Sequence, residues 1–303
     1  MNMRLDSIDG PVIMARAAEY NFQELIRAEY PERKGRNHVP VNFEGGPGAR
    51  YLTRQHIDYA GRARLTSRPG YDTPKVDLLG APDTIPVYSA EQEYEINFQE
   101  AREAMFADFQ VSSEKAMAAG ELIRALEDEI TYLGAPSQGI HGLFSSRLPR
   151  IVSTVNFNDP ALSADDAVDA LTEWANAIYT TLTKTVLKAN AVIMPSKVLT
   201  YMLSKRRSEH DPTTVMRAFK ESNPWIDMID DAVWCDIAGA GETPAMLFYN
   251  RDPRYVEFHI PHPLEQLVKS ESQVCNTYLV HERIAGIRYK NRLSAVIVEG
   301  FWY

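Results

Sequence analysis

The sequence predicts an α+β fold in which a strand leads into one long helix and most other strands come late in the chain. Its 303 residues are 45% hydrophobic, which is enough for a sizeable core and excludes a disordered or collagen-like chain. Helical periodicity is strongest in the middle of the chain, whereas short apolar or alternating runs follow Trp225. The β-α-β alternation of a nucleotide-binding sheet does not occur.

The first part of the chain predicts one helix and then an extended segment. Apolar residues at helical spacing predict a helix over residues 12–28, which Pro31 ends. Residues 33–75 contain nine basic and three acidic side chains, few apolar ones and little periodicity. Such a segment cannot bury a core of its own, so it is predicted to be an extended arm with a long loop. The run Gly45–Gly48 favours a hinge over an anion-binding nest, because no strand precedes it and no helix follows.

A strand and the clearest helix of the chain come next. Alternating apolar and acidic residues predict a strand over residues 85–98 that turns Glu91, Glu93 and Glu95 to solvent. Ser112 or Ser113 is expected to cap a helix over residues 114–133, about 30 Å long, which Gly134 and Pro136 end. The predicted apolar face of this helix comprises Met117, Leu122, Ile123, Leu126, Ile130 and Leu133.

The remaining chain predicts three more helices among short strands. A second long helix over residues 163–188 begins with Ser163 and Asp166 as a capping pair. Pro195 opens a helix to Leu203, and Thr213 or Thr214 opens one that ends near Glu221. The predicted strands cover residues 191–194, 232–237, 245–249, 255–260, 274–283 and 294–299.

The charge is distributed unevenly. The formal net charge is −9, yet residues 1–75 hold 12 basic against 9 acidic side chains, and residues 76–135 hold 3 against 13. Aromatic residues interleave the basic ones around residues 50–64, as they do in proteins that stack nucleic-acid bases. Self-association, with the basic segment of one copy on the acidic segment of another, explains both segments, whereas nucleic-acid binding explains only the basic one. The sequence therefore favours self-association.

No catalytic, cofactor or metal motif is found, and none of these sites is predicted. The phosphate-binding, nucleophile-elbow and HExxH patterns do not occur. His259 and His262, with His281 and Glu282 downstream, have residue types that bind zinc, but their spacing is unspecific. The favoured alternative places His259 on a strand and His262 in a loop between two prolines. An enzyme with an unrecognised site near these histidines stays open as a lesser alternative.

The sequence also predicts the compartment. Cys235 and Cys275 lack paired spacing, which favours free thiols in a reducing compartment, although one disulfide remains possible. The N-terminus shows no signal-peptide pattern, and no apolar run reaches membrane-spanning length. A cytoplasmic protein without membrane contact is expected.

The order of these elements resembles the major capsid proteins of tailed bacteriophages with the Hong Kong-97-type fold. Three local patterns add to the likeness: residues 139–143 (Gly-Ile-His-Gly-Leu) after the long helix, residues 190–195 (Asn-Ala-Val-Ile-Met-Pro) before a helix, and the closing segments 282–288 and 295–300. The resemblance implies an N-terminal arm over residues 1–48, an extended loop (the E-loop) over 49–84, and the peripheral domain with its spine helix 114–133 over 85–145. It also implies an axial domain over 146–250 and closing strands over 251–303.

The resemblance further implies a virion protein, assembled in the bacterial cytoplasm, that forms pentamers and hexamers of an icosahedral shell around double-stranded DNA. Portal and scaffolding proteins are implied partners, a decoration protein is a further one, and packaged DNA would be contacted non-specifically. Because no scaffolding segment opens the chain, a separate scaffolding protein or an already mature chain is expected. A nanocompartment shell of the encapsulin kind is the main alternative. Lys75 and Asn291 are nominal partners for a covalent cross-link, but an ordinary surface lysine and a turn asparagine are favoured.

The residues expected at contacts between copies are charged ones. Basic side chains of the E-loop would face acidic side chains of a neighbouring peripheral domain, and the charged loop 205–211 would lie near the local symmetry axes. The basic candidates are Arg50, Arg54, Arg62, Arg64 and Lys75; the acidic ones are Glu91, Glu93, Glu95, Glu127 and Glu129; and the loop contributes Arg206 and Arg207.

Overall fold

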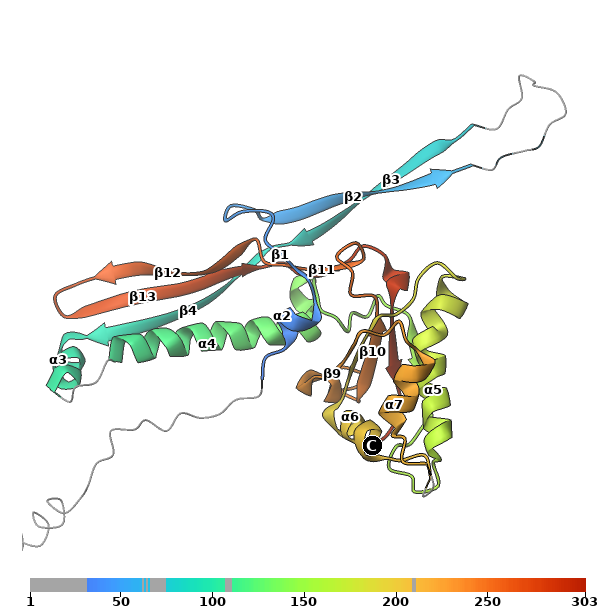
Figure 1. Ribbon diagram of the computed structural model, residues 1–303. Coiled ribbons are helices and arrows are strands. Elements are labelled where there is room, and N and C mark those ends of the chain that lie inside the picture. The colour runs from blue at the N-terminus through green and yellow to red at the C-terminus, as the bar shows by residue number, and fades with distance from the viewer. Residues whose placement is uncertain (1–31, 62, 64, 66–74, 107–110, 209–210) are drawn as a thin grey trace, which may run out of the picture. The chain divides into compact units, whose positions relative to one another are not determined.

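Residues 33–303 build a five-stranded sheet, two three-stranded sheets and a long two-stranded hairpin (Figure 1). The computed structural model describes residues 32–61, 63, 65, 75–106, 111–208 and 211–303. The helix predicted over residues 12–28 lies outside them. No helix in the described ranges combines the length and apolarity needed to cross a membrane.

The predicted extended loop is a β-hairpin. Strand β2 (Tyr51–Ala60) pairs antiparallel with β3 (Asp77–Pro86) without a register shift, from Tyr51 opposite Pro86 to Ala60 opposite Asp77. The single strand predicted over 85–98 is therefore wrong at its start. It combines the last two residues of β3 with a separate strand, β4, across a break in the pairing. Val87, whose amide donates to the Arg50 carbonyl over 2.9 Å, separates β3 from β4 (Tyr88–Asn97), where the chain passes from the hairpin to another sheet.

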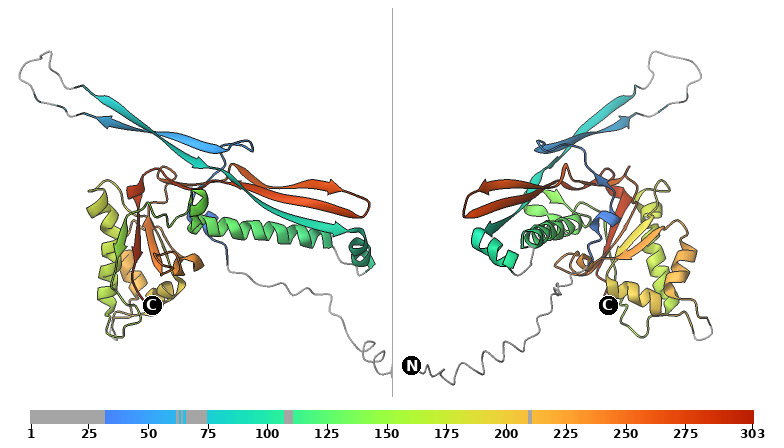
Figure 2. Two further views of the ribbon diagram at one scale, coloured as in Figure 1. Left: turned by 180° about the vertical axis from the view of Figure 1, so that it is seen from behind. Right: turned by 60° about the vertical axis from the view of Figure 1, so that its left-hand side comes forward.

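Strand β4 forms an antiparallel sheet with the late strands β12 (His262–Glu271) and β13 (Cys275–Ile284), in the order β12-β13-β4. Helix α4 (Val111–Tyr132) lies along one face of this sheet in each view of Figure 2. Ala90 and Tyr94 of β4 are buried on the helix side, and the glutamates between them are exposed. The predicted alternation is confirmed. Helix α3 (Phe98–Phe106), between β4 and α4, was not predicted.

The long helix is confirmed, but it already includes Val111, so Ser112 and Ser113 lie within it and do not cap it. Half of its predicted apolar face is also wrong. Met117, Leu122 and Leu126 are 42–58% exposed, whereas Ala119 and Gly120 are buried together with larger side chains such as Ile123 and Ile130. Small side chains let the helix approach the sheet closely: a Cβ at position 120 would lie 3.6 Å from a methyl group of Leu264. The face of α4 that packs on the sheet is therefore the one whose small side chains allow the closest contact, even though the opposite face carries larger apolar residues.

Five strands form the second large sheet, in the order β7-β15-β10-β8-β9. Helices α5 (Ala164–Ala177), α6 (Ser196–Ser204) and α7 (Val215–Ser222) supply the core on one face of it, where Leu171, Trp174 and Phe219 join Phe248 and Val298. Its strands are β7 (Arg150–Val152), β8 (Ala191–Met194), β9 (Met228–Asp231), β10 (Ala245–Tyr249) and β15 (Ala295–Glu299).

Two predictions in this part of the chain are wrong and one is confirmed. The strand predicted over 232–237 is the 3₁₀ helix η3 (Val233–Asp236), and β9 just before it holds the sheet edge. The helix predicted to reach residue 188 leaves α-geometry at Ala177 and ends in the π-helical turn η2 (Ile178–Leu182). At its start, the Ser163 hydroxyl accepts from the Asp166 amide, as the capping pair predicts.

A small sheet joins these parts. Strand β1 (Val41–Asn42) runs parallel to β11 (Val256–His259), which pairs antiparallel with β14 (Gly286–Tyr289). The short helix α2 (Gly35–His38) precedes β1, and the 3₁₀ helix η4 (Arg292–Ser294) follows β14. Strands β5 (Gly134–Ala135) and β6 (Ile140–His141), separated by the 3₁₀ turn η1 (Pro136–Gln138), form a tight pair after α4.

Candidate assembly surface

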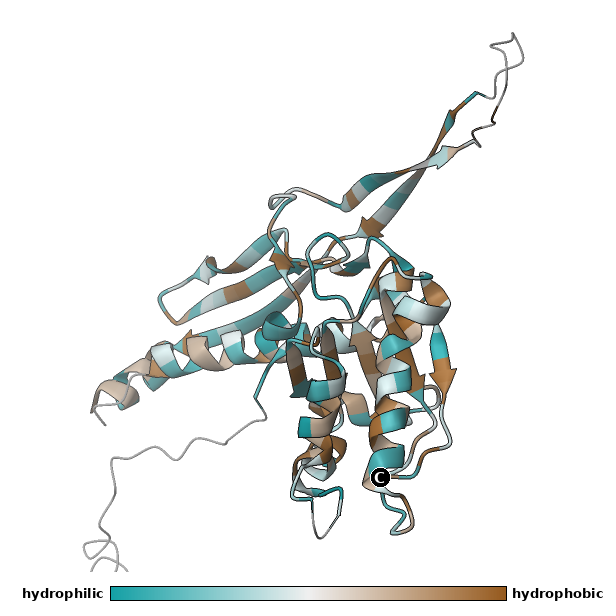
Figure 3. Cartoon of the chain, turned by 45° about the vertical axis from the view of Figure 1, so that its right-hand side comes forward, coloured by the Kyte–Doolittle hydropathy of each residue, from teal (hydrophilic) through white to brown (hydrophobic). Residues whose placement is uncertain are grey.

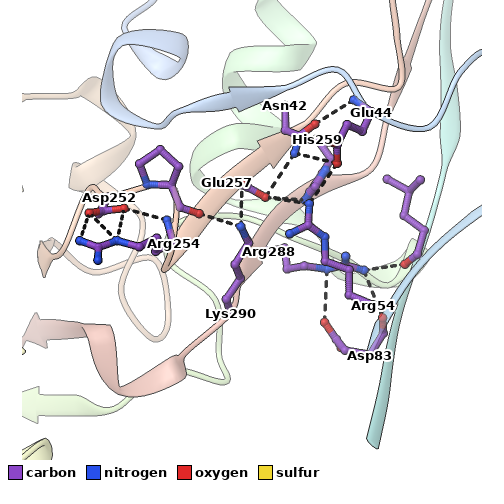
Figure 4. Close-up of polar contacts among 12 residues, drawn as sticks. Asn42, Glu44, Arg54, Asp83, Asp252, Arg254, Glu257, His259, Arg288 and Lys290 are labelled. Atoms are coloured by element: carbon purple, nitrogen blue, oxygen red, sulfur yellow. Dashed lines mark hydrogen bonds and ion pairs between the residues drawn. The ribbon is translucent and has the colours of Figure 1, made fainter. Parts of the chain in front are cut away.

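A buried arginine fastens both strands of the β2–β3 hairpin at its base. Arg288 of β14 is 2% exposed, and its Nη2 donates to the Leu52 carbonyl over 2.5 Å and to the Asp83 carbonyl over 3.2 Å. Its Nε lies 3.3 Å from the Asp83 carboxylate. Leu52 belongs to β2 and Asp83 to β3, so one guanidinium ties each strand to the small sheet (Figure 4).

At the base of the hairpin, the carboxylate of Glu257 contacts two cationic side chains. Glu257 of β11 lies 2.7 Å from the Lys290 ammonium and 3.4 Å from Arg54 Nη2. Burial alone would raise the pKa of Glu257, but the hydrogen bond and charge of Lys290 outweigh burial and lower it. Arg54 also contacts Glu44 over 3.2 Å. This predicted contact residue is therefore partly engaged within its own chain, and 36% of its side chain stays exposed.

His259 belongs to the same cluster and is 2% exposed. Burial, together with the charge of Arg288, lowers its pKa to about 4, so the ring is neutral at pH 7. The carboxylate of Glu257 is 3.6 Å from its Nε2. His262, by contrast, contacts Glu265. The two histidines of the enzyme site that the sequence left open therefore contact different carboxylates, Glu257 and Glu265.

The hairpin and its flanks expose charged and apolar side chains together. Arg50, directly before β2 at the base, and Lys75, before β3 at the far end, are both exposed, which leaves them available for the predicted contact. Arg62 and Arg64 lie outside the described residues. The strands of the hairpin show apolar positions along their length in Figure 3. Its large apolar side chains that are at least 60% exposed are Tyr51, Ile57, Tyr59, Leu78 and Leu79, and Val76 adjoins them.

The acidic candidates of β4 share one face of their sheet. Glu91, Glu93 and Glu95 are exposed on the side opposite α4. Lys269 of β12 forms an ion pair with Glu93, with both side chains about half exposed. The face predicted from alternation is thus present, and Glu91 and Glu95 remain the more available of the three for a neighbour's cation.

Glu127 differs from its prediction. It is 3% exposed, and Arg36 holds its carboxylate with two hydrogen bonds of 2.6 and 2.8 Å. The same guanidinium reaches the fully buried Glu282 over 3.0 Å. Arg36 of the same chain therefore neutralises Glu127, which we leave out of the proposed contact between copies. Glu129, two positions on and facing outward, is exposed.

The basic residues before β1 dock onto this chain's own acidic groups. Lys34 lies 2.7 Å from Asp230 and 2.6 Å from Asp231. His38 is fully buried, where its Nδ1 lies 2.6 Å from the Tyr132 hydroxyl. Sequence reasoning missed this docking site. The acidic pair Asp230–Asp231 was visible in the sequence, but nothing local linked it to a lysine almost two hundred positions earlier.

The remaining candidates lie elsewhere. In the loop after α6, Arg206 is exposed, and Arg207 pairs with Asp165 over 2.6 Å between half-exposed side chains. Asn291 caps η4, because its side-chain oxygen accepts from the Leu293 amide over 2.9 Å. This local role is the ordinary one that the sequence favoured for Asn291.

Comparison with known proteins agrees with this geometry. Residues 61–300 match the family model of the major capsid protein. The match spans well over half of the chain, which therefore belongs to the major capsid protein family. It is accordingly a structural component of the virion capsid, and the family is not an enzymatic one. No curated protein sequence matches the chain.

Solved structures establish the fold. The capsid of Myoviridae phage XM1 superposes with a TM-score of 0.84 and 22% identity, covering 96% of this chain and 99% of that one. The capsid of a native GTA particle gives 0.63 and 13% over 99% and 100%. A virus-like particle from Pyrococcus furiosus gives 0.55 and 16% over 87% and 91%. The α+β Hong Kong-97-type capsid fold is confirmed.

Proposed function

We propose that copies of this chain assemble as pentamers and hexamers into the icosahedral shell of a tailed phage, which encloses double-stranded DNA. The family match and the nearly complete superposition on a phage capsid support this proposal. Closed symmetry is required for contacts between unlike surfaces to end in a shell instead of a fibre.

Each part of the chain has a proposed role in the shell. Residues 1–48 are assigned to the arm and 49–84 to the E-loop, which contains the β2–β3 hairpin except for the last two residues of β3. Residues 85–145 begin the peripheral domain, and 146–250 form the axial domain around the five-stranded sheet. Residues 251–303 return to close both, since β13 pairs with β4 and with β12, while β15 pairs with β10.

The exposed hairpin is the observation on which this assembly mechanism rests. A two-stranded ribbon is at best marginally stable alone, and this one leaves aromatic and aliphatic side chains such as Tyr59 and Leu78 in solvent. Exposed apolar surface of this kind marks an interaction site. Because Arg288 anchors the base, the ribbon presents this surface from a fixed root. A second copy of the chain is the proposed cover.

Charge selects the docking site on that second copy. Arg50, Arg54, Lys75 and the two arginines beyond the described residues, Arg62 and Arg64, would meet the acidic face of the neighbour's peripheral sheet. Glu91, Glu93 and Glu95 supply that face, and Glu129 is an exposed carboxylate on α4, at the other side of the sheet. An exposed ion pair contributes only about 0–1 kcal/mol, but each pair is repeated in every copy of the shell.

Other partners follow from the proposed shell. A portal, a scaffolding protein and a decoration protein are proposed to bind it, with Arg206 and Arg207 near the local symmetry axes. Packaged DNA is proposed to touch the inner wall without sequence preference. The net charge of −9 supports weak contact with DNA, because a chain with excess negative charge does not attract phosphate strongly.

Shortening the hairpin tests the proposal. Residues 57–80 are replaced by Asn-Gly, which keeps the paired residues up to His56 and Ala81 and leaves the Arg288 anchors in place. We expect folded subunits that no longer form stable shells, since the apolar and basic contact surface is removed. Circular dichroism reports the fold, and negative-stain microscopy with light scattering reports assembly.

The outcomes separate the alternatives. Shells of ordinary stability from the shortened chain would refute the clamping role, and loss of the circular dichroism signal would refute the assignment of these residues to a loop. The surface control is Lys220→Glu, because Lys220 is exposed on α7 and lies outside the hairpin. This variant should form shells like the parent chain. If shells purified from the native host enclose an enzyme and no DNA, the nanocompartment alternative replaces the phage shell.

A further inference from the structure

Three metal-binding side chains meet at the base of the β12–β13 hairpin. The Glu265 carboxylate lies 2.7 Å from Nε2 of His262 and 3.8 Å from Nε2 of His281. The two imidazole rings stack with their centroids 5.5 Å apart and their planes inclined by 23°. One ligand atom from each residue lies within 4.8 Å of the other two. Both histidines are partly buried, and the glutamate reaches solvent.

A β-bulge brings these residues onto one face. His262 stands opposite Arg283 and Glu265 opposite His281, so three steps along β12 match two along β13. In a regular strand, residues three apart point to opposite faces. The extra residue of the bulge cancels this difference and turns His262 to the side of Glu265. Pro263, within the bulge on the edge strand, donates no amide to the ladder.

We propose that His262, Glu265 and His281 bind a divalent transition-metal ion, with zinc as the favoured metal. Two imidazole nitrogens and one carboxylate oxygen form a donor set that zinc accepts, whereas magnesium and calcium prefer oxygen ligands alone. Zinc needs ligand bonds of about 2.0–2.2 Å, so its ligand atoms lie roughly 3.4 Å apart in a tetrahedron. The two separations between carboxylate and imidazole, 2.7 and 3.8 Å, lie on either side of that distance.

The surrounding charges are compatible with a cation. Glu91, the register partner of His281 on β4, adds an exposed carboxylate on the same face. Arg283 is the register partner of His262, but its guanidinium donates to the Pro47 carbonyl in the turn before β2. Three protein ligands leave the fourth tetrahedral position to water or to a donor from a second copy.

The bound ion would join the edge strand to the middle strand of the peripheral sheet. Elsewhere β12 is mostly exposed, and among the described strands only β13 pairs with it. Two of the ligands come from β12 and one from β13, so metal binding would stabilise this hairpin pairing by binding the folded state only. Neither the ligands nor this effect depends on the shell itself.

Titration of the metal-free full-length chain with CoCl₂ tests the site, because tetrahedral cobalt is coloured and substitutes for zinc. We expect one visible-absorbing Co²⁺ per chain, displaced by ZnCl₂, and a rise in the thermal unfolding midpoint with ZnCl₂. His262→Gln, Glu265→Gln and His281→Gln should each weaken Co²⁺ binding about tenfold or more, since each removes one of three ligands.

The matched control is Glu93→Gln, which removes a carboxylate from the same face of the sheet but none from the cluster. It should leave Co²⁺ binding unchanged. Circular dichroism confirms that each variant is folded; should one not fold, Glu265→Asp, which shortens the ligand by one methylene, replaces it. Absence of the cobalt spectrum in the parent chain, or equal binding by the ligand variants, would overturn the proposal and leave an ordinary His–Glu hydrogen bond.

Discussion

At the scale of single residues, Arg36 lies between two buried carboxylates, those of Glu127 and Glu282. One half-exposed guanidinium serves two buried carboxylates, and Oε2 of Glu282 has no hydrogen-bond partner among the described residues. Burial first, and then the charge of Glu127, raises the pKa of Glu282 to about 7. A carboxyl group with a raised pKa favours its neutral form in the folded chain.

The free energy of unfolding should therefore fall as pH rises, because of Glu282. Between its unfolded pKa near 4.5 and about 7, the folded chain binds more protons than the unfolded one, so the free energy of unfolding falls with increasing pH. We expect Glu282→Gln to remove a loss of about 1–3 kcal/mol between pH 5 and pH 8. Urea unfolding of both chains at the two pH values measures it.

The control for this prediction is Glu129→Gln, which removes an exposed carboxylate from the same helix that carries Glu127. Its unfolding midpoint should follow that of the parent chain at both pH values. If Glu282→Gln and the parent lose stability in parallel with rising pH, Glu282 is ionised throughout and the assignment is wrong.

At the scale of elements, the end of α4 depends on two glycines that touch. Gly134 has φ of +74°, and a Cβ there would lie 2.5 Å from the Gly142 nitrogen. A Cβ on Gly142 would lie 2.4 Å from the Tyr132 carbonyl oxygen. The backbone of the β5–β6 turn therefore packs directly on the last turn of the helix, with no room for a side chain.

Alanine at Gly134 should destabilise the chain by about 3 kcal/mol or more, because the left-handed conformation and a backbone clash both oppose it. Gly46 offers a matched control: its φ is +72°, but a Cβ there would meet no described atom within 4 Å. Gly46→Ala should cost only about 1 kcal/mol. Urea unfolding midpoints compare the two, and equal losses would show that the crowding at Gly134 relaxes freely.

At the scale of the whole molecule, the uneven charge has a spatial counterpart. Basic side chains remain exposed on the β2–β3 hairpin, and acidic ones remain exposed on β4, yet the basic residues of α2 and its flank are already paired within the chain. The charged residues thus form two sets. One set pairs within the chain and docks residues 33–38, and the other, the external set, stays exposed and available for contacts between copies.

Charge reversal tests the external set. Arg50→Glu with Lys75→Glu should lower the fraction of chain that sediments as shells, and so should Glu91→Lys with Glu95→Lys. Each double variant places like charges at the proposed contact. All four substitutions in one chain should restore assembly towards the parent level, because complementarity returns with opposite sign. No recovery in the fourfold variant would contradict this contact.

Predictions held where the determining interactions were local. The capping pair at Ser163, the glycine stop at Gly134 and the alternation of β4 each depend on neighbours within a few residues or on a single solvent boundary. They failed where two distant segments compete. Ala119 and Gly120 of α4 are buried where Leu122 and Leu126 were expected to be. The distance between helix and sheet decides this, and that distance is set only when the two layers pack together.

The sequence by itself determined the α+β class, the long helix, the basic and acidic segments and the resemblance to phage capsid proteins, since composition, periodicity and element order are properties of the chain. Only the tertiary structure decided which charges are already paired. It placed Glu127 beside Arg36 and His259 beside Glu257, and it brought His262 together with Glu265 and His281. The physical reason is register: pairing and one bulge between β12 and β13 set which side chains share a face, and no local pattern encodes that choice.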